Sequence, residues 1–593
     1  MPTRPRRARR QRLLPLLALA LSCAALAADP SKVLHVASPD IETLDPHQYN
    51  DDPSFQIIGA IFETLYQWDY LAATPTLSPV AADGPPQVSA DGLTWTIRIK
   101  ANIYFTDDPA FKGKARELVA KDFVYSITRW LDPNLRRGGA PQSADLIVGA
   151  RAVIDAARAS GNLDYDHPIA GLRALDRYTL QLRLTQPNYP VAQAILNYFV
   201  CAREVVEAAH GDIHARPVGT GPYRLREWKR GSRLVLEANP KYRALAFPAS
   251  DDPARAALES AMRGKTLPQI GVIEVAFIEE DLTRLLEFDR GALDVVVLRA
   301  EIAARLLADN QLRPEYAARG IVRHVFTEPF IFAIYFNMND PVIGGMDNRR
   351  VALRRAIALA FDRKTLIDVV YAGQALPANQ LVPPGVSGYD PALPPAPPAN
   401  PAVANALLDR FGYKARDAEG FRLAPDGKRL TLTLSLRTGT VSRETATLWK
   451  KNLDAIGLRS DFHIAPFQDV IKELQAGQYQ IFSGGYGGVP FGYPQLWQLD
   501  ARQPGPVNVS RFESADAEKA VDAFFASRDE AGRIAAARKG SEIAAAYVPV
   551  MPTIFRQEND FTQPWVQGYS PMRFTNYWKY LDIDLARAHQ AQR

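Results

Sequence analysis

An uncharged, aromatic-rich stretch offers the clearest binding chemistry in this sequence. Between Leu474 and Leu499 there is no Asp, Glu, Lys, Arg or His, and six aromatic side chains stand among six glycines. Flat aromatic faces and bare backbone suit stacking on, and hydrogen bonding to, a neutral ligand in a mostly apolar pocket. The alternative interpretation is a core strand followed by its glycine-rich turn.

Catalytic chemistry has weak support in the residue pattern. His210 and His214 stand one helical turn apart, but no H-E-x-x-H motif surrounds them, so two surface histidines are the better interpretation than a zinc pair. Ser442 and Ser483 lack a G-x-S-x-G frame, and Cys201 has no motif context. We therefore predict a protein that is not an enzyme, with no catalytic residue, no metal and no cofactor.

The first 27 residues have the pattern of a signal peptide. Six arginines and no acid precede residue 28, an apolar run from 13 to 26 is too short to anchor in a membrane, and Ala25-Leu26-Ala27 suits cleavage before Ala28. The sequence thus predicts export to the periplasm. A lipoprotein box ending at Cys23 and a twin-arginine signal at Arg9-Arg10 match their patterns less well.

Removing this leader changes the charge and thiol content. Loss of six arginines turns the formal net charge from +5 to −1, so there is no electrostatic reason to expect a nucleic-acid partner. Cys201 would be the one remaining thiol, and no intramolecular disulfide is expected. Stability must then come from buried area, for which 593 residues with 47% hydrophobic content suffice in two or three domains.

The elements that position these groups alternate between strands and helices. Apolar residues at helical spacing predict a helix over about 53–66, and a second helix over 347–362 carries four arginines that we assign to a solvated face. Asp122 is interpreted as a cap or first-turn carboxylate of a helix through Trp130, and Trp130 itself as a core residue. Strand, helix and strand follow one another after residue 271, which indicates α/β layers.

A predicted hairpin over 216–242 carries a longer pattern. It reads V-G-T-G-P-Y-x-L-x-x-W and then L-x-x-N-P-x-Y, with turn residues before and after two alternating strands. This pattern resembles the signature of the peptide and nickel class of ABC-transporter substrate-binding proteins, the extracytoplasmic solute-binding family 5. T-L-D-P at 43–46, the helix at 347–362 and P-W-V-x-G-Y at 564–569 also resemble segments of that family. The resemblance spans essentially the whole mature chain.

The resemblance implies an α/β, bilobal periplasmic-binding-protein fold of type II, in its large three-domain class, with the ligand in a cleft between lobes that close by hinge motion. It implies the following division: signal peptide 1–27, lobe I first segment 28–75, inserted small domain 76–200, lobe I second segment 201–304, lobe II 305–540 and lobe I C-terminal segment 541–593.

The resemblance also suggests ligand contacts. Phe62-Glu63-Thr64-Leu65 resembles the F-E-G-L segment that places a glutamate beside the ligand in oligopeptide binders, although a solvated helix carboxylate is an equal alternative for Glu63. Peptide-binding relatives carry an aspartate for the α-ammonium where this chain has Val489 or, with a shifted alignment, Gly492, so neither choice restores an acid. The implied contacts, besides Glu63, are Tyr486, Gly487, Gly488, Val489, Pro490, Phe491 and Tyr493.

These features together predict a periplasmic binding component of an ABC importer, monomeric, with permease and ATPase subunits as partners. A peptide or peptide-like solute is the first expectation. The missing acid leaves open a blocked peptide or a non-peptide such as a sugar, opine or haem. A periplasmic signalling or chaperone-like binding protein without transport is the alternative from another class.

Overall fold

One large sheet organises the molecule. The computed structural model describes residues 28–72, 76–135, 142–487, 493–503, 505, 507–572 and 574–591. Within this part of the chain, ten strands follow the order β20-β19-β21-β17-β22-β13-β1-β12-β9-β8, and two further strands, β16 and β18, also pair with β22. The sheet is mixed, because β1 runs parallel to β12 and β13, whereas β22 runs antiparallel to its partners.

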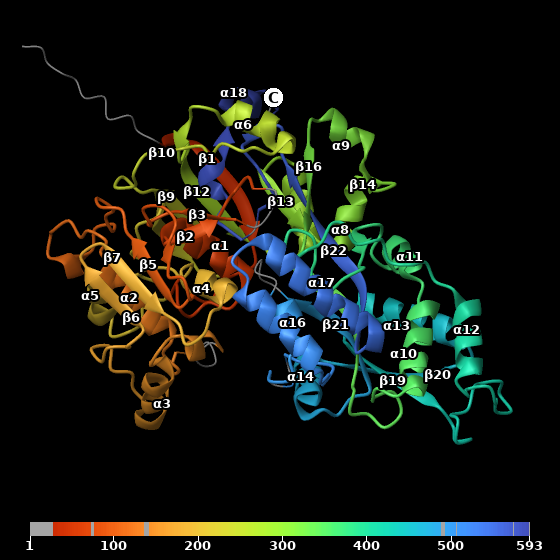
Figure 1. The fold of residues 1–593 in the computed structure, drawn as a ribbon. Helices are drawn as coiled ribbons and strands as arrows, with labels where there is room; N and C mark the ends of the chain where they lie inside the picture. The colour runs from red at the N-terminus through yellow and green to blue at the C-terminus, as the bar shows by residue number, and fades with distance from the viewer. Residues whose placement is uncertain are drawn as a thin grey trace, which may run out of the picture.

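Strand β22 (Val550–Thr562) is shared by two lobes. Its C-terminal half pairs with β13 and β16 and its N-terminal half with β17 and β18. We name as lobe I the strands on one side: β1 (Asp29–Ser38), β8 (Tyr223–Lys229), β9 (Arg233–Ala238), β12 (Ile270–Phe277), β13 (Val295–Leu298) and β16 (Val322–Thr327). On the other lie those of lobe II: β17 (Phe330–Phe336), β18 (Ala375–Pro377), β19 (Thr431–Arg437), β20 (Arg459–Ala465) and β21 (Ile481–Gly487). This division by strand pairing differs from the predicted boundary at residue 305, because β16 pairs with the same half of β22 as β13. Figure 1 shows the two lobes side by side with β22 between them.

The strand sequences explain their positions. Five of the seven residues of β17 (F-I-F-A-I-Y-F) are buried, as expected for a strand covered on both faces. The alternation T-L-T-L-S-L-R of β19 buries its leucines, and Leu34 and Val36 of β1 do the same in lobe I. One continuous apolar core joins both lobes, because it includes Leu34 of lobe I together with Tyr335 and Phe524 of lobe II.

A smaller sheet lies beside lobe I. Its order is β4-β5-β7-β6, with β4 (Gln87–Val88), β5 (Thr94–Arg98), β6 (Leu172–Asp176) and β7 (Thr179–Arg183). Four two-stranded ribbons complete the strands: β2 (Tyr66–Trp68) with β3 (Leu77–Pro79), β10 (Leu245–Ala246) with β11 (Thr266–Leu267), β14 (Leu307–Ala308) with β15 (Gln311–Leu312), and β23 (Val566–Gln567) with β24 (Asp582–Ile583).

Helices cover both lobes. Those on the lobe I side are α1 (Asp52–Ile61), α2 (Ala120–Trp130), α3 (Ala150–Ser160), α4 (Tyr189–Ile195), α5 (Arg203–Ala208), α6 (Ala256–Met262), α7 (Asp281–Asp289), α8 (Ala300–Ala303), α9 (Pro314–Ala318) and α18 (Leu585–Ala591). Those on the lobe II side are α10 (Asn348–Ala360), α11 (Arg363–Thr365), α12 (Pro401–Arg410), α13 (Thr440–Ala455), α14 (Phe467–Ala476), α15 (Tyr493–Trp497), α16 (Ala515–Ala526) and α17 (Glu530–Tyr547). Among the described residues, none of these helices is both long and apolar enough to cross a membrane.

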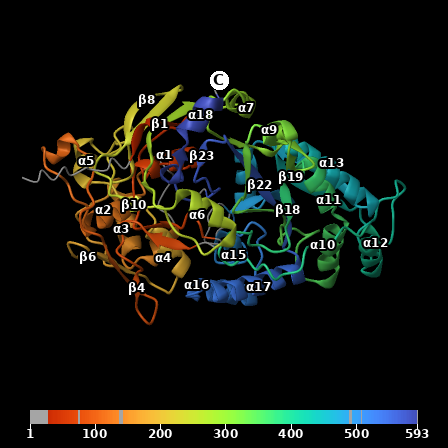
Figure 2. The ribbon, with the colours of Figure 1, turned by 90° about the horizontal axis from the view of Figure 1, so that it is seen from above.

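The lobes also touch away from the sheet. Helices α16 and α17 form a pair along one side of the molecule, and α16 contacts α4 (Figure 2). Arg528, in the turn between α16 and α17, donates a hydrogen bond to the carbonyl of Ala90 and lies 5.9 Å from the ring centre of Tyr189. The lobes are therefore joined both by the shared strand β22 and by the contacts of α16 and Arg528.

The first helix ends earlier than its sequence pattern predicts. The apolar spacing predicts a helix to residue 66, but α1 ends at Ile61 and the next residues are extended. The cause is the V-G-T-G-P-Y turn, since Gly221 donates its N–H to the carbonyl of Ile61 at 2.8 Å. A Cβ at Gly219 would lie 2.0 Å from the same oxygen, so only glycine permits this close approach. Glu63 thus lies on an extended segment and not on a helix.

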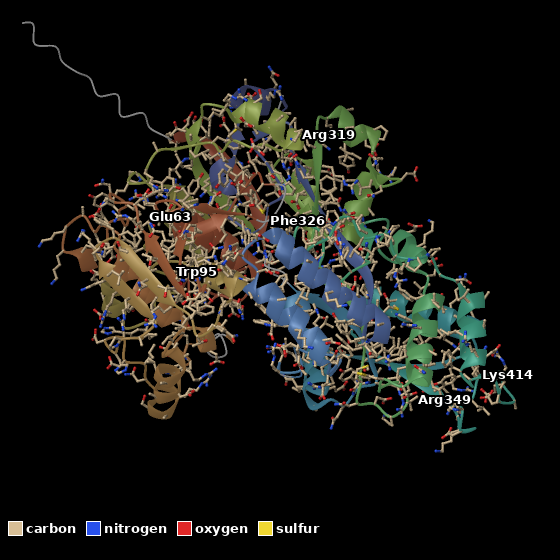
Figure 3. All side chains as sticks on the ribbon, viewed as in Figure 1. Glu63, Trp95, Arg319, Phe326, Arg349 and Lys414 are labelled. Atoms are coloured by element: carbon tan, nitrogen blue, oxygen red, sulfur yellow. The ribbon has the colours of Figure 1, made fainter. Side chains whose placement is uncertain are left out.

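One arginine of α10, Arg354, does not lie on the solvated face that the sequence pattern predicts. Arg349 and Arg355 are exposed, as predicted, and Figure 3 shows Arg349 at the far end of lobe II. Arg354, however, is fully buried and donates to the carbonyls of Ile343, Gly345 and Tyr547. It ties α10 to the end of α17, and its bonds to carbonyl oxygens explain how a guanidinium is tolerated there.

Candidate ligand-binding cleft

A cleft of about 1250 Å³ lies between the lobes. Its walls come from α1 and the residues around it, the segment 197–199, the strand ends at 36–39 and 326–330, and the C-terminal segment 569–579. The described lining residues include seven carboxylates and four cationic side chains: Asp51, Asp52, Glu63, Glu279, Asp281, Glu328 and Glu558, with Arg284, Arg299, Arg556 and Lys579. The cleft is therefore aromatic and polar, with an excess of negative charge.

Aromatic rings form one wall. Trp130, at the end of α2, stacks on Tyr198 with ring centres 3.7 Å apart. Phe55 of α1 and Tyr49 pack against Phe199 at 5.8 and 6.1 Å. Trp130 packs against the main core, as predicted, but it is only partly buried and its ring also lines the cleft. Such flat, rigid surfaces give a ligand large contact area.

Glu63 lies in the cleft wall but is committed to a partner. Its side chain is 3% exposed, and one carboxylate oxygen accepts a hydrogen bond from Arg243 at 2.8 Å. The other oxygen is buried, and no donor from the described residues reaches it. Figure 3 places Glu63 toward the middle of the molecule. The contact with a ligand stays a prediction, and the alternative of a solvated helix carboxylate is wrong, since the side chain is neither solvated nor helical.

Lys579 lies near this pair. Its ammonium donates to Gln67 Oε1 at 2.8 Å, and burial lowers the pKa of Lys579 to about 8, against the opposing effect of Glu63. Lys579, Arg243 and Glu63 together carry a net positive charge on the lobe I side of the cleft while Lys579 is protonated. This arrangement can attract an anionic group.

Glu328 and Arg556 mark the place where the chain passes between the lobes. Glu328 stands between β16 and β17, and Arg556 stands in the middle of β22. The guanidinium of Arg556 donates two hydrogen bonds to the Glu328 carboxylate, at 2.8 and 2.7 Å, and the backbone N–H of Glu328 donates to the Arg556 carbonyl at 3.0 Å. Both side chains line the cleft.

A second carboxylate changes the electrostatics of this pair. Burial, and then the charge of the neighbouring Glu558, raise the pKa of Glu328 to about 8, despite the opposing effect of Arg556. Two carboxylates therefore share one guanidinium, and the retained proton belongs to the acid pair as a unit. A cationic ligand group placed here would supply the missing positive charge.

A third charged group stands where β12 leads into α7 and β13 ends. The buried carboxylate of Asp281 accepts hydrogen bonds from Arg299 at 2.7 Å and from Arg284 at 3.2 Å, and the Arg299 side chain is largely exposed. Arg284 also donates to the carbonyl of Ile278. These arginines can meet an anionic ligand group at the cleft edge.

The glycine-rich segment is described only in part. Tyr486 and Gly487 end β21, paired with Ile331 and Phe330 of β17, and a Cβ at Gly487 would lie 2.3 Å from the carbonyl of Pro329. Neither residue is among those that line the cleft, whereas their neighbours Phe330 and Trp497 are. Gly488, Val489, Pro490 and Phe491 lie outside the described residues, as does the side chain of Tyr493, so ligand contact by this segment stays a prediction.

The sequence pattern did not identify Glu328, Glu558 and Arg556. These charged residues lie at the lobe crossing, the place where the chain passes between the lobes. Glu328 and Arg556 are 228 positions apart, and nothing local in the sequence connects them. A signal was nevertheless present, since R-Q-E-N-D at 556–560 places polar residues inside an otherwise apolar strand. Polar residues in a central strand need partners or a function. In the ranges that the structure describes, no cluster of three or more His, Cys, Asp or Glu side chains could hold a metal ion.

Comparison with known proteins fits this geometry. A family model described as "Bacterial extracellular solute-binding proteins, family 5 Middle" matches residues 76–504, which is most of the chain. The protein belongs to this family. It is therefore a solute-binding protein, and the predicted family and α/β fold are confirmed.

Several relatives cover nearly the whole protein. This family 5 chain is 26% identical over 588 residues to "Di/tripeptide-binding protein 2" of Pseudomonas aeruginosa, which covers 96% of this chain and 98% of the relative. It is 23% identical over 562 residues to "Periplasmic oligopeptide-binding protein OppA" of Salmonella typhimurium, covering 92% and 90%. The solved structure of HbpA2 from Haemophilus parasuis shares its fold, with a TM-score of 0.73 at 19% identity over 93% of this chain and 99% of the other.

Proposed function

We propose that this protein is the periplasmic binding component of an ABC importer and that it captures a short peptide or peptide-like solute in the cleft between its lobes. The curated relatives reported above carry names that state di-, tri- or oligopeptide binding. Support from the geometry comes from the size of the cleft, because about 1250 Å³ exceeds the roughly 300–1,000 Å³ of ordinary small-molecule sites. In this proposal the protein acts as a monomeric carrier without catalysis.

The observation that carries this proposal is the mixed charge of the cleft. Carboxylates at the lobe crossing and on α1 face a cleft that also contains Arg284, Arg299 and Lys579. A zwitterionic chain with an ammonium at one end and a carboxylate at the other matches both signs of charge. The absence of an acid at Val489 therefore does not exclude a free ammonium, since Glu328 and Glu558 can supply the countercharge from other elements.

The uncharged segment from 474 to 499 supports one alternative. If its aromatic rings and glycine backbone form the ligand contacts, the ligand has a neutral end, such as an acetylated peptide, or is a non-peptide solute. A free peptide and an acetylated peptide differ in the charge of the terminal nitrogen, so matched compounds of these two kinds can distinguish the alternatives.

Isothermal titration calorimetry with matched peptides tests the function. Trialanine, N-acetyl-trialanine and trialanine amide, followed by longer peptides, are titrated into protein freed of co-purified ligand by unfolding and refolding. We expect micromolar or tighter binding of free peptides and weaker binding of the acetylated form. Tighter binding of the acetylated peptide would favour the neutral-end alternative. No binding of any peptide, with a non-peptide identified by mass spectrometry of the purified protein, would overturn the proposal.

A further inference from the structure

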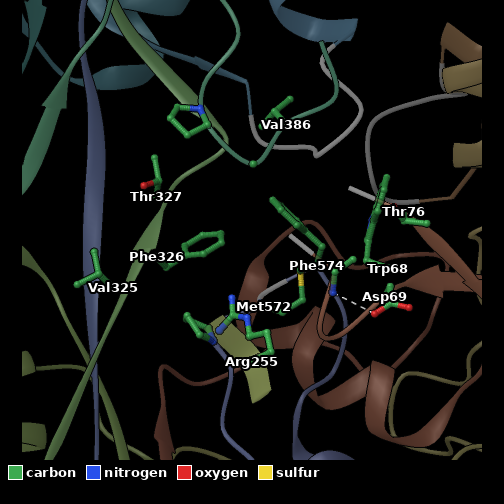
Figure 4. Close-up of a pocket in the computed structure, with 14 residues that line it drawn as sticks. Trp68, Asp69, Thr76, Arg255, Val325, Phe326, Thr327, Val386, Met572 and Phe574 are labelled. Carbon is green, nitrogen blue, oxygen red and sulfur yellow. Dashed lines mark hydrogen bonds between the residues drawn. The ribbon is translucent and has the colours of Figure 1, made fainter. Parts of the chain in front are cut away.

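A second, smaller pocket of about 200 Å³ opens beside the cleft. It shares Trp68, Phe326 and Phe574 with the cleft, so the two spaces are adjacent. Lobe I provides Trp68 at the end of β2, Phe326 of β16 and Phe574 near the C-terminus, and lobe II provides the turn at 384–386. Figure 4 shows Phe326 pointing across this side pocket toward Phe574 and Trp68.

Among its described lining residues, the side pocket combines apolar side chains with one cationic group. Aromatic rings, Met572 and Val386 contribute apolar surface, and the guanidinium of Arg255 lies beside Met572 (Figure 4). Arg255 ends the short helix η3 (Pro253–Arg255), and its side chain is 31% exposed. Its Nε is buried and has no hydrogen-bond acceptor among the described residues. An unsatisfied charged donor costs more than a neutral one, so this position favours an incoming anion.

Two nearby acids do not take the place of that anion. The Asp252 carboxylate approaches Arg255 Nε only to 3.9 Å, and its other oxygen accepts the N–H of Ala254 at 2.9 Å. Asp69, which also lines the side pocket, accepts hydrogen bonds from the N–H groups of Leu71 and Ala72 and from the hydroxyl of Ser78. Both carboxylates are thus held by their own loops, and the guanidinium keeps donors available to a ligand.

We propose that this side pocket is a subsite for the carboxylate-bearing apolar end of the ligand, with Arg255 as the residue that recognises the carboxylate. The inference rests on the proposed function and adds the site that reads the acidic end of the solute. A volume of 200 Å³ corresponds to about seven water molecules at ~30 Å³ each, which is room for one terminal residue and not for a whole peptide. Aromatic walls select an apolar side chain beside that carboxylate.

Matched ligands and an Arg255 substitution test the subsite. Ala-Ala-Phe and its C-terminal amide differ only in the charge of the end group, and Arg255→Met keeps the length and apolar body of the side chain. We expect the wild-type protein to prefer the acid by about tenfold or more, the effect of a charge-assisted hydrogen bond. The preference should vanish in R255M and return in part in R255K.

A control variant separates a local effect from a general one. Arg263 follows α6, its side chain is 73% exposed, and it pairs with Glu259 at 3.3 Å away from the side pocket. R263M should keep the preference for the acid. If R255M discriminates acid from amide as well as the wild type does, or if R263M loses discrimination equally, the proposal is wrong.

A second probe keeps this test independent of peptide binding. 3-Phenylpropanoate carries an aromatic ring and a carboxylate on a short linker, and 3-phenylpropanamide is its neutral match. Saturation-transfer NMR should detect the acid on the wild type and lose it on R255M. Binding of this acid without any peptide binding would overturn the proposed function and leave the subsite standing. Equal signals from acid and amide would overturn the subsite.

Discussion

At the scale of single residues, the lobe crossing concentrates the chemistry that matters. Glu328, Glu558 and Arg556 put two carboxylates beside one guanidinium in a buried position. A buried acid with a raised pKa holds a proton that it would lose in water, because ionising it in the buried site costs free energy. A cation placed beside the acid would lower that cost. The group is therefore a candidate for sensing ligand charge, although a structural ion pair accounts for the Arg556–Glu328 bonds themselves.

The first prediction concerns pH and Glu328. Its ordinary pKa is 4.5, and in the folded protein it is raised to about 8, so between these values the folded state keeps a proton that the unfolded chain has lost. The contribution of this group to the free energy of unfolding must then fall as the pH rises from 4.5 to 8. Glu328→Gln cannot ionise, and it should flatten the decline of the melting temperature between about pH 5 and 8.

Two variants control that measurement. Burial is the larger cause of the raised pKa of Glu328, and Glu558→Gln removes the second cause, the charge of Glu558, so it should flatten the same profile in part while leaving the Arg556 partner in place. Glu542→Gln, on the exposed face of α17, should leave the profile of the wild type unchanged. A decline in E328Q and E558Q that is as steep as in the wild type would show that other groups carry the pH dependence.

At the scale of elements, the signature hairpin acts through its turn. Gly219 and Gly221 press against the last carbonyl of α1, so the turn both ends the helix and fixes the start of the segment that carries Glu63. The sequence pattern identified the hairpin and its residues well because strand alternation and turn residues are local signals. It misplaced the end of α1 because the stop comes from a turn some 160 residues away in the chain.

Gly219→Ala is the second prediction. Its Cβ would meet the Ile61 carbonyl at 2.0 Å, and relieving that clash should cost about 1–3 kcal/mol in urea unfolding. Amide hydrogen exchange at the C-terminal end of α1 should accelerate as well. Gly231→Ala, in the loop of the same hairpin, meets no atom within 4 Å but has a φ of +67°, so it should cost about 1–2 kcal/mol and leave exchange in α1 unchanged. Unaltered α1 exchange in G219A would refute the role given to the turn.

A buried ion pair joins α2 to the segment before α1. Arg129 donates two hydrogen bonds of 2.7 Å to the carboxylate of Asp45, and both side chains are almost completely inaccessible. Arg129 also contacts the ring of His47 at 2.9 Å. Removing one partner would leave an uncompensated charge in a low-dielectric environment.

The third prediction is a contrast between single and double variants. Asp45→Asn or Arg129→Met alone should reduce the free energy of unfolding by about 3–5 kcal/mol, whereas the double variant should lose less than the sum of both. The exposed pair Arg203–Asp166 provides the control, since solvent screens it and Asp166→Asn should leave the free energy of unfolding almost unchanged. Additive losses at positions 45 and 129 would show that the pair is not coupled.

The predictable and unpredictable parts of the cleft differ in physical origin. The strands, the helix over 347–362 and the acid at Asp122 follow local rules of periodicity and capping, and Asp122 does accept the N–H of Val119. The surroundings of Arg354 and Trp130 do not follow from such local rules, because the burial of a side chain depends on which distant element packs against its helix. The lobe crossing could not be predicted, since its members meet only when β22 pairs with residues far earlier in the chain.

At the scale of the whole molecule, the two crossings define how the lobes can move. The chain passes from lobe I to lobe II between β16 and β17 and returns within β22, and Glu328 and Arg556 sit at these two places. Because the chain crosses at only these two places, changes in a few backbone dihedral angles there can alter the angle between the lobes. We expect ligand binding to narrow the cleft.

Small-angle X-ray scattering provides the fourth prediction. The radius of gyration should decrease when a bound peptide is added at saturating concentration, because both lobes contribute to the cleft walls. Glu328→Gln and Arg556→Met should alter the ligand-free value, since they remove the charged link between the crossings. A radius of gyration unchanged at saturation would show that the peptide binds without closure.

The shared strand β22 has a consequence for how the chain is made. Both halves of the large sheet depend on residues 550–562. These residues pair with β13, β16, β17 and β18, which all come much earlier in the chain. Neither lobe can therefore complete its sheet until β22 has been synthesised. Until β22 emerges, the nascent chain lacks the strand that hydrogen-bonds to the strands of both lobes and so joins them in one sheet.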